Sequence, residues 1–191
     1  MSMTFEHQID EVYPPREDTY LLLRASLKEA RADDVALEIG CGCGLISQEV
    51  APRVKSILAT DINPHAARMA KEKGLEVVRS DLFSGLRGKF DLILFNPPYL
   101  PTTDLERTDQ WIDFALDGGD DGRKTIRRFL KGLSGHLRPG GRALLLVSSL
   151  TGLHEVRGMA EAEGLDVRDV ARHRFFFEQL HVLRLEVAHS R

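Results

Sequence analysis

The chain alternates short apolar runs with amphipathic stretches, and this alternation constrains its fold more than any other feature of the sequence. Apolar runs of strand length occupy 35–40, 54–61, 75–81, 89–96 and 141–149, and two further strands are predicted in LDVRDVARHRFF and LHVLRLEV at the C-terminal end. Helical spacing occurs at 17–31, 45–53, 63–73, 122–138 and 153–164. Strands that alternate with helices build a mainly parallel sheet. We therefore predict an α/β fold with a mainly parallel sheet, whose last two strands form a hairpin with one antiparallel member.

Apolar side chains indicate which parts of these segments face a core. At helical spacing, 17–31 carries Tyr20, Leu23, Leu27 and Ala30, and 122–138 carries Ile126, Phe129, Leu130, Leu133 and Leu137. Three phenylalanines stand in a row at 175–177. We expect two of these rings to pack in a core or an interface and one to point away.

Length and charge limit the classes of protein to consider. A chain of 191 residues fits one domain, which we divide into an N-terminal helical segment at 1–33 and a Rossmann-like core at 34–191. A net charge of -3 gives no overall basic field for nucleic acid, and the longest aliphatic run, at 143–147, is far too short to span a membrane. Because no signal peptide is read at the N-terminus, we expect a cytoplasmic protein without membrane contact.

Two cysteines and scattered histidines give no sign of a metal site. Cys41 and Cys43 lie two residues apart, with no neighbouring histidine, and a lone C-x-C of this kind is a poor zinc site. The seven histidines show no paired spacing. We therefore assign no metal and read the cysteines as free thiols in a reducing compartment.

Polar residues or glycine stand at the ends of four successive predicted strands. They are Gly40, Asp61, Asp81 and Asn96. The carboxyl ends of parallel strands meet at one edge of an open sheet, where ligands bind, so we expect these residues to surround a crevice.

The segment EIGCGCG at 38–44 places glycines at this edge, where the backbone can turn tightly and approach a ligand, although a plain tight turn explains it as well. Asp61 lies 21 positions after Gly40, and an acid at about that separation accepts hydrogen bonds from ribose hydroxyls. Asp81 is placed to accept from an adenine amino group. Either acid alone is also explained as a helix cap or a solvated residue, but together with the glycines they favour an adenosine site. A nucleoside triphosphate is disfavoured because the chain lacks the G-x-x-x-x-G-K-[ST] loop.

The strand at 89–96 ends in Asn96-Pro97-Pro98-Tyr99. Prolines cannot extend a central strand, and the simplest interpretation is a rigid turn. Behind EIGCGCG and Asp61, however, NPPY resembles the motif of class I S-adenosyl-L-methionine (AdoMet)-dependent methyltransferases that act on planar nitrogen. VYPPREDTYLLL at 12–23 and ALDGGDDGR at 115–123 are similar to the HemK-like glutamine N5-methyltransferases, which modify release factors. The resemblance covers nearly the whole chain and implies the class I methyltransferase fold, a seven-stranded, mainly parallel sheet with helices on both faces and a C-terminal antiparallel hairpin.

The resemblance also implies roles for individual residues. Contacts to AdoMet are expected from Thr19, Glu38, Gly40, Gly42, Asp61, Ile62, Asp81, Leu82 and Asn96. The substrate is expected to contact Asn96, Pro97, Pro98 and Tyr99, with Asn96, Pro97 and Tyr99 as the catalytic residues. An amide nitrogen is a weak nucleophile, so two acceptors, the Asn96 side-chain oxygen and the Pro97 carbonyl, must hold its hydrogens. Pro98 confines Pro97 to an extended conformation, and Tyr99 offers an aromatic face to a planar substrate.

The expected reaction is methylation of the glutamine amide in the GGQ motif of a class I peptide chain release factor. An N6-adenine methyltransferase of DNA or RNA and a non-catalytic AdoMet-binding module remain alternatives. The resemblance to the short archaeal and eukaryotic branch implies a heterodimer with a small zinc-containing activator subunit, which we expect to cover the strand edge in LEVVRS. Residues 100–121 are expected to close over the substrate. The basic residues at 123–131 are expected to form a solvated face, although they also suit RNA or an acidic partner.

Overall fold

The computed structural model describes residues 11–99, 101, 111–112 and 117–188. Its strands are β1 (Val35–Ile39), β2 (Ser56–Asp61), β3 (Val77–Arg79), β4 (Phe90–Phe95), β5 (Leu137–Ser148), β6 (Leu165–Arg174) and β7 (Gln179–Val187). Its helices are α2 (Glu17–Glu29), α3 (Leu45–Val50), α4 (Pro64–Glu72), α6 (Lys124–His136) and α7 (Leu153–Ala162), with short 3-10 turns η1 (Ala51–Arg53) and η3 (Ser149–Thr151). Every helix and strand predicted from the sequence within these residues is present.

The strands form one sheet in the order β3-β2-β1-β4-β5-β7-β6. The first five run parallel, β7 runs antiparallel to β5, and β6 pairs with β7 as a hairpin. This confirms the predicted seven-stranded, mainly parallel sheet and its C-terminal antiparallel hairpin. The strand order reverses between β1 and β4, and in open α/β sheets this switch point is where a ligand crevice forms.

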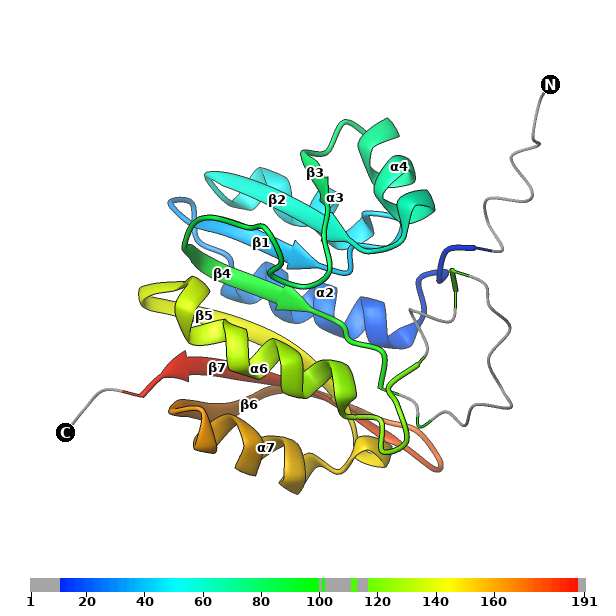
Figure 1. Ribbon diagram of the computed structural model, residues 1–191, viewed down its shortest axis with the longest axis vertical. Coiled ribbons are helices and arrows are strands. Elements are labelled where there is room, and N and C mark those ends of the chain that lie inside the picture. Colours follow the sequence, from blue (N-terminus) through cyan, green and yellow to red (C-terminus); the bar gives the residue numbers. More distant parts are fainter. Residues whose placement is uncertain (1–10, 100, 102–110, 113–116, 189–191) are drawn as a thin grey trace.

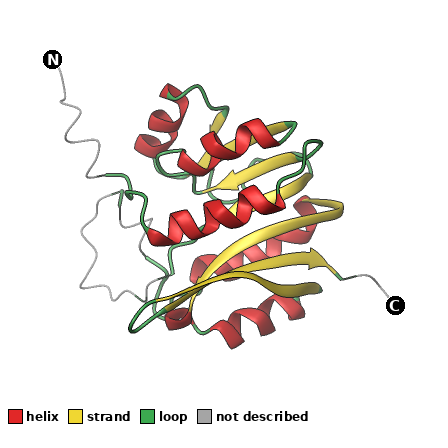
Figure 2. Ribbon diagram, turned by 180° about the vertical axis from the view of Figure 1, so that it is seen from behind, coloured by secondary structure: helices red, strands yellow, loops and turns green. Residues whose placement is uncertain are grey.

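Helices cover both faces of the sheet. In Figure 1, α6 and α7 lie in front of the sheet, and their buried Phe129, Leu133 and Val156 pack with Leu37 and Ile93 of the strands. Figure 2, seen from behind, shows α2 crossing the other face, where Leu22 of α2 joins a second core with strand residues such as Leu92 and Leu144. Because both faces are covered, the central strands are apolar along most of their length, which is typical of parallel sheets.

The buried face of α2 differs in part from the predicted one. Tyr20 is 47% exposed, whereas Leu21, Leu22 and Ala25 are buried. Leu23, Leu27 and Ala30 are partly buried and pack against the same core, as their spacing indicated. The helix has several leucines in succession, and its packing against the sheet centres the buried face on Leu21, Leu22 and Ala25 and leaves Tyr20 outside it. In α6, by contrast, Ile126, Phe129, Leu130 and Leu133 are buried as predicted.

One further expectation is wrong in detail, and another is tested only for contacts within the chain. The predicted strand at 75–81 is shorter, because β3 spans only Val77–Arg79 and Asp81 lies in the loop beyond it. Of the three phenylalanines, only Phe175 packs against the core, while Phe176 and Phe177 are exposed. The reason is geometric: Phe176 and Phe177 occupy the tip between β6 and β7, where no element of the described chain covers them.

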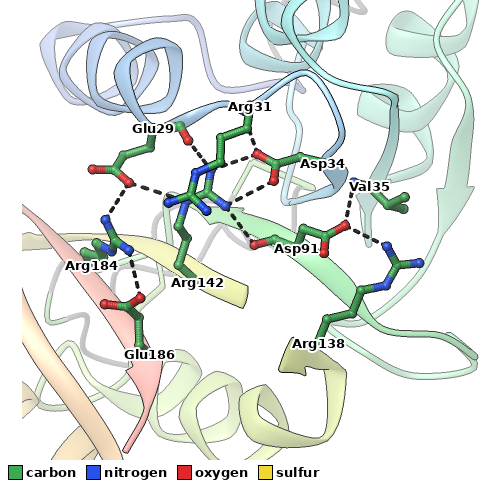
Figure 3. A network of polar contacts seen from close by, with 9 residues as sticks. All are labelled: Glu29, Arg31, Asp34, Val35, Asp91, Arg138, Arg142, Arg184 and Glu186. Carbon is green, nitrogen blue, oxygen red and sulfur yellow. Dashed lines mark hydrogen bonds and ion pairs between the residues drawn. The ribbon is translucent and has the colours of Figure 1, made fainter. Parts of the chain in front are cut away.

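A network of charged side chains, centred on the buried pair of Arg142 and Asp34, joins the amino ends of the parallel strands (Figure 3). Arg142 of β5 is fully buried, and its two terminal nitrogens donate to the Asp34 carboxylate at 3.2 and 2.8 Å. The same guanidinium donates to the Asp91 carbonyl at 3.1 Å and to the Glu29 carbonyl at the end of α2. Although burial, the largest single influence, raises the pKa of Asp34, the hydrogen bonds from Arg142 and from the Arg31 N–H, together with the charges of both arginines, hold that pKa below its usual value. The Arg142–Asp34 pair therefore ties α2, β1, β4 and β5 together at the edge opposite to Asp61 and Asn96.

None of the helices among the described residues is long and apolar enough to cross a membrane.

Candidate functional site

A cavity of about 560 Å³ opens at the carboxyl ends of the strands, around the switch point. Its size falls in the range of ligand pockets, about 300–1,000 Å³. The residues expected to contact a cofactor or a substrate all line it: Thr19, Glu38, Gly40, Gly42, Asp61, Ile62, Asp81, Leu82, Asn96, Pro97, Pro98 and Tyr99. The fold thus brings together residues that the sequence spreads over more than 80 positions.

The glycine loop between β1 and α3 borders the cavity with left-handed backbone. Gly40 has φ 65° and Gly42 has φ 52°, conformations that side-chain-bearing residues rarely adopt. Gly44 is needed for close packing as well, because a Cβ there would lie 2.7 Å from Leu75 and 3.0 Å from Ala70 of α4. This path of the backbone therefore requires glycines. Because glycines have no side chains, peptide groups form the cavity wall here.

Asp61, the last residue of β2, organises this loop. One carboxylate oxygen accepts from the Gly42 N–H at 2.8 Å, and the other accepts from the Asn63 N–H at 2.9 Å. Burial raises the pKa of Asp61. A carboxylate has about four acceptor positions, so both oxygens retain capacity for a ligand's hydroxyl groups.

Glu38 of β1 lies deeper in the wall. It accepts hydrogen bonds from both the backbone N–H, at 2.8 Å, and the hydroxyl of Ser47 on α3. Burial raises the pKa of Glu38 to about 8. A ligand ammonium group beside it would favour the ionised form, so such a ligand would release a proton as it binds.

The loop after β3 carries local strain beside the cavity. Leu82 has φ 51°, a left-handed conformation that is unfavourable for a branched side chain. The Ser80 hydroxyl, which lies 3.0 Å from the Leu82 carbonyl and 2.7 Å from that of Ser84, supports the turn. Asp81 pairs with Arg128 of α6 at 2.7 Å, so that a ligand would have to share this exposed carboxylate with an arginine.

The Asn96 side chain has a fixed orientation. Its Nδ2 donates to Oδ2 of Asp18, a buried residue in the first turn of α2, at 3.1 Å. A carboxylate only accepts hydrogen bonds, so the amide must turn its nitrogen toward Asp18. Its Oδ1 is buried and has no hydrogen-bond partner in the described part of the chain. An unpaired buried acceptor costs about 1–3 kcal/mol, which a ligand that donates to it would recover.

Asp18 and Tyr13 are site residues that sequence reasoning missed. Besides Asn96, the Asp18 Oδ2 atom accepts from the hydroxyls of Tyr13 at 3.2 Å and Tyr99 at 3.4 Å. Its Oδ1 accepts from the Thr19 N–H at 2.6 Å. Burial, and then the charge of Asp18, raise the pKa of both tyrosines, so they stay protonated and donate at neutral pH. One carboxylate therefore orients the asparagine and the tyrosine of the NPPY motif.

The glycines at 118–122 have a specific reason to be there. A Cβ on Gly122, which has φ 69°, would lie 2.4 Å from the Tyr99 carbonyl oxygen. The same carbonyl accepts from the Thr151 hydroxyl at 3.3 Å. The GGDDG segment thus packs directly on NPPY. Most of the expected lid at 100–121 lies outside the described residues; within it, Trp111 and Asp117 line the cavity.

Comparisons with known proteins agree with this geometry. Residues 17–112 match the family model of the methyltransferase small domain. A putative protein N5-glutamine methyltransferase of Methanocaldococcus jannaschii is 45% identical over 180 residues, which cover 91% of this chain and 90% of that protein. The chain belongs to the HemK-like glutamine N5-methyltransferases.

Other members of this family set the chain in context. A release factor glutamine methyltransferase of Cereibacter sphaeroides is 34% identical over 164 residues, which cover 79% of this chain and 59% of that longer protein. The structure of the E. cuniculi Mtq2–Trm112 complex, which methylates the termination factor eRF1, superposes with a TM-score of 0.79 at 28% identity and covers 93% of this chain and 99% of that one. This superposition over nearly the whole of both chains confirms the resemblance to the short archaeal and eukaryotic branch of the family.

Among the residues that the structure describes, no three His, Cys, Asp or Glu side chains gather in a way that could hold a metal ion.

Proposed function

We propose that this protein methylates the side-chain amide nitrogen of the glutamine in the GGQ motif of a class I peptide chain release factor, with AdoMet as the methyl donor. One observation carries the proposal: Asn96, which lines the cavity beside Pro97, has an acceptor oxygen that is unpaired in the described part of the chain and whose orientation Asp18 fixes. The relatives named for release factor methylation support the choice of substrate. A translation factor as substrate would place the reaction in the cytoplasm.

The polar groups that line the cavity suit the hydrogen-bonding groups of AdoMet. Asp61 offers carboxylate acceptors for ribose hydroxyls, and the glycine loop leaves peptide groups exposed to the amino acid part. Glu38 and Thr19, which line the cavity, would contact the methionine part, and Ile62 and Leu82, which also line it, would give apolar contact to the adenine. When bound, AdoMet supplies a methyl carbon attached to a positively charged sulfur.

The NPPY residues prepare the amide nitrogen for this methyl group. The lone pair of an amide nitrogen is delocalised into its carbonyl. Asn96 Oδ1 and the Pro97 carbonyl would accept hydrogen bonds from the two N–H groups and direct the lone pair toward the methyl carbon. Formation of the N–C bond goes with cleavage of the C–S bond of AdoMet, which leaves as S-adenosylhomocysteine, and the nitrogen then loses one proton to solvent. As charge develops on nitrogen these hydrogen bonds strengthen, so they stabilise the transition state more than the bound substrate. Because Asn96 Oδ1 is covered, the side chains around it must move apart when the substrate enters.

The basic residues of α6 give little support to a nucleic acid substrate. Arg123 and Arg127 both pair with Asp121, and Arg128 pairs with Asp81. Two carboxylates therefore already compensate part of the positive charge that would face a phosphate backbone.

We also propose that a small zinc-containing activator subunit covers the outer edge of β3. Val78 of this edge strand is 44% exposed, and β3 pairs only with β2 in the described chain. An open edge of this kind invites a partner. Coexpression with such a subunit should give a stable heterodimer. A lone chain that is monomeric, well behaved and fully active would contradict this.

The substrate assignment is tested with radiolabelled AdoMet. The protein, with its activator if one is required, is incubated separately with a class I release factor and with DNA and RNA oligonucleotides. Label should enter the release factor only, and Asn96→Ala should cut turnover strongly while the Kd for AdoMet changes little. Label in the oligonucleotides alone would favour the adenine methyltransferase, and no transfer to any substrate would favour a binding module.

A further inference from the structure

The connection between β6 and β7 has an unusual composition. The Phe175 N–H donates to the Glu178 carbonyl at 2.7 Å, which leaves only Phe176 and Phe177 in the loop. Two-residue hairpin loops favour Asn-Gly and similar pairs, and other turns of this chain use glycine, for example Gly140 and Gly164. Phe176 is 91% exposed and Phe177 is 86% exposed. Folding does not explain two aromatic rings in this place.

The hairpin tip is held firmly at its base. The Glu178 carboxylate accepts from the Ser148 hydroxyl at 2.6 Å, and the Gln179 N–H donates to the Ser149 hydroxyl at 2.9 Å. Phe175 packs into the core beside α2. The rings of Phe176 and Phe177 contact each other edge to face, with centroids 4.6 Å apart. The tip therefore presents a preorganised apolar surface, which reduces the entropy lost on binding a partner.

The tip lies next to the active site. Leu180 at the start of β7 pairs with Ser148 at the end of β5, so the hairpin tip stands at the carboxyl edge of the sheet. A depression of about 260 Å³ starts at the hairpin base, where Phe175 and Glu178 line it, and reaches Asp18 and Tyr99. These last two residues also line the main cavity. The depression thus connects the base of the hairpin, which flanks the two exposed rings in the chain, to Tyr99 of the NPPY motif.

We propose that Phe176 and Phe177 form a docking site for the protein that carries the target glutamine, a contact separate from the one made with the glutamine itself. The inference rests on the proposed function, because it needs a macromolecular substrate at the neighbouring site. Exposed Arg172 and Arg174 precede the tip on β6, so the matching surface of the substrate is an apolar patch with an acidic rim. Docking at a distance from the reacting amide raises the local concentration of the glutamine loop without altering the chemical step.

A double variant, Phe176→Ser with Phe177→Ser, tests the docking site against two substrates. One is an intact class I release factor, and the other is a short peptide around its target glutamine, too short to reach the tip. Interface residues of this kind commonly contribute enough for about a tenfold or larger change in affinity. We expect KM for the intact protein to rise about tenfold or more, with kcat and the Kd for AdoMet unchanged. With the short peptide, kcat/KM of the variant should equal that of the wild type.

A matched control and the contrary outcomes complete the test. Val187→Ser alters an exposed apolar residue (41%) at the opposite edge of the sheet and should leave all constants unchanged. Unchanged KM for the intact protein in the double variant would overturn the docking site, and so would an equal loss with both substrates, which would place the rings in the active site itself. A wild type that dimerises through the tip, with a monomeric variant of normal kinetics, would assign the surface to a second copy. If wild type methylates neither substrate, the proposed function fails instead.

Discussion

Replacing Asp18 by asparagine tests how the orientation of Asn96 is set. In the wild type, Asp18 Oδ1 accepts from the Thr19 N–H at 2.6 Å and Oδ2 accepts from Asn96 Nδ2 at 3.1 Å. An asparagine at 18 must keep its oxygen toward the Thr19 N–H, so its NH₂ group takes the place of Oδ2. The new side chain then offers a donor to Asn96, which must turn its own oxygen toward residue 18. The cavity receives an NH₂ group where it had an acceptor.

The size of this effect follows from the hydrogen bonds involved. The wild-type orientation is held by a bond to a charged group, worth about 1.5–3 kcal/mol, and the reversed orientation gains a neutral bond worth about 0.5–1.5 kcal/mol. The balance between the two orientations therefore moves by about 2–4 kcal/mol. Because the wild type already holds the competent orientation almost fully, only the preference of the variant for the reversed orientation, about 0.5–1.5 kcal/mol, lowers the rate. At about 1.4 kcal/mol for each factor of ten, kcat should fall roughly 3- to 13-fold. The hydroxyls of Tyr13 and Tyr99 can either donate or accept, so they adapt to the change.

The assay is methyl transfer to release factor at saturating AdoMet, with calorimetric measurement of AdoMet binding. We expect Asp18→Asn to lower kcat as given, while the Kd for AdoMet stays within a few-fold because the Thr19 contact is kept. Tyr13→Phe is the matched control: it removes another partner of the same oxygen without reversing Asn96, and kcat should change little. A kcat for Asp18→Asn equal to that of Tyr13→Phe would refute the reasoning.

Three further predictions concern stability and backbone. In Gly122→Ala, the new Cβ would lie 2.4 Å from the Tyr99 carbonyl oxygen, and the left-handed φ would be strained. Both effects should displace the NPPY motif and lower kcat at least about tenfold. Normal turnover would show that the packing of residue 122 on Tyr99 does not matter for the reaction. Because the folded-state pKa of Glu38, about 8, exceeds its ordinary 4.5, its contribution to stability is full below pH 4.5 and is lost as pH rises to 8. Denaturation at several pH values should therefore show that the free energy of unfolding of the wild type falls by up to about 1.4 kcal/mol per pH unit in this window, and that this fall is absent in Glu38→Gln. Equal slopes for the two proteins would contradict the assignment. Arg142→Met should lower the free energy of unfolding by about 3–5 kcal/mol, and Arg138→Met, whose ion pair is exposed, by less than about 1 kcal/mol; equal losses in urea denaturation would be inconsistent with the buried pair.

The sequence predicts most of the fold because the strands of a covered parallel sheet are continuous apolar runs that end in distinctive residues. Gly40, Asp61 and Asn96 stand at or just beyond the ends of β1, β2 and β4, where the alternation of strands and helices places them. The buried stripe of α2 could not be chosen in the same way. Its leucines satisfy two adjacent stripes, and only contact with the sheet decides that Tyr20 is exposed and Leu22 is buried.

The site is predictable only as far as its motifs are local. The NPPY motif and the glycine loop are each contiguous, so their residues could be named from the sequence. Asp18 could not, because its contact with Asn96 joins residues 78 positions apart, and an acid in the first turn of a helix has a sufficient local explanation in the helix dipole. The exposure of Phe176 and Phe177 was likewise hidden, since an aromatic run usually indicates a core.

The most direct test of the central claim is a crystal structure of this protein with S-adenosylhomocysteine and an intact release factor. The target glutamine nitrogen should lie within about 2.7–3.2 Å of both Asn96 Oδ1 and the Pro97 carbonyl oxygen, with Asn96 Nδ2 still on Asp18. A glutamine held elsewhere, or an Asn96 that faces the substrate with its NH₂ group, would contradict the account.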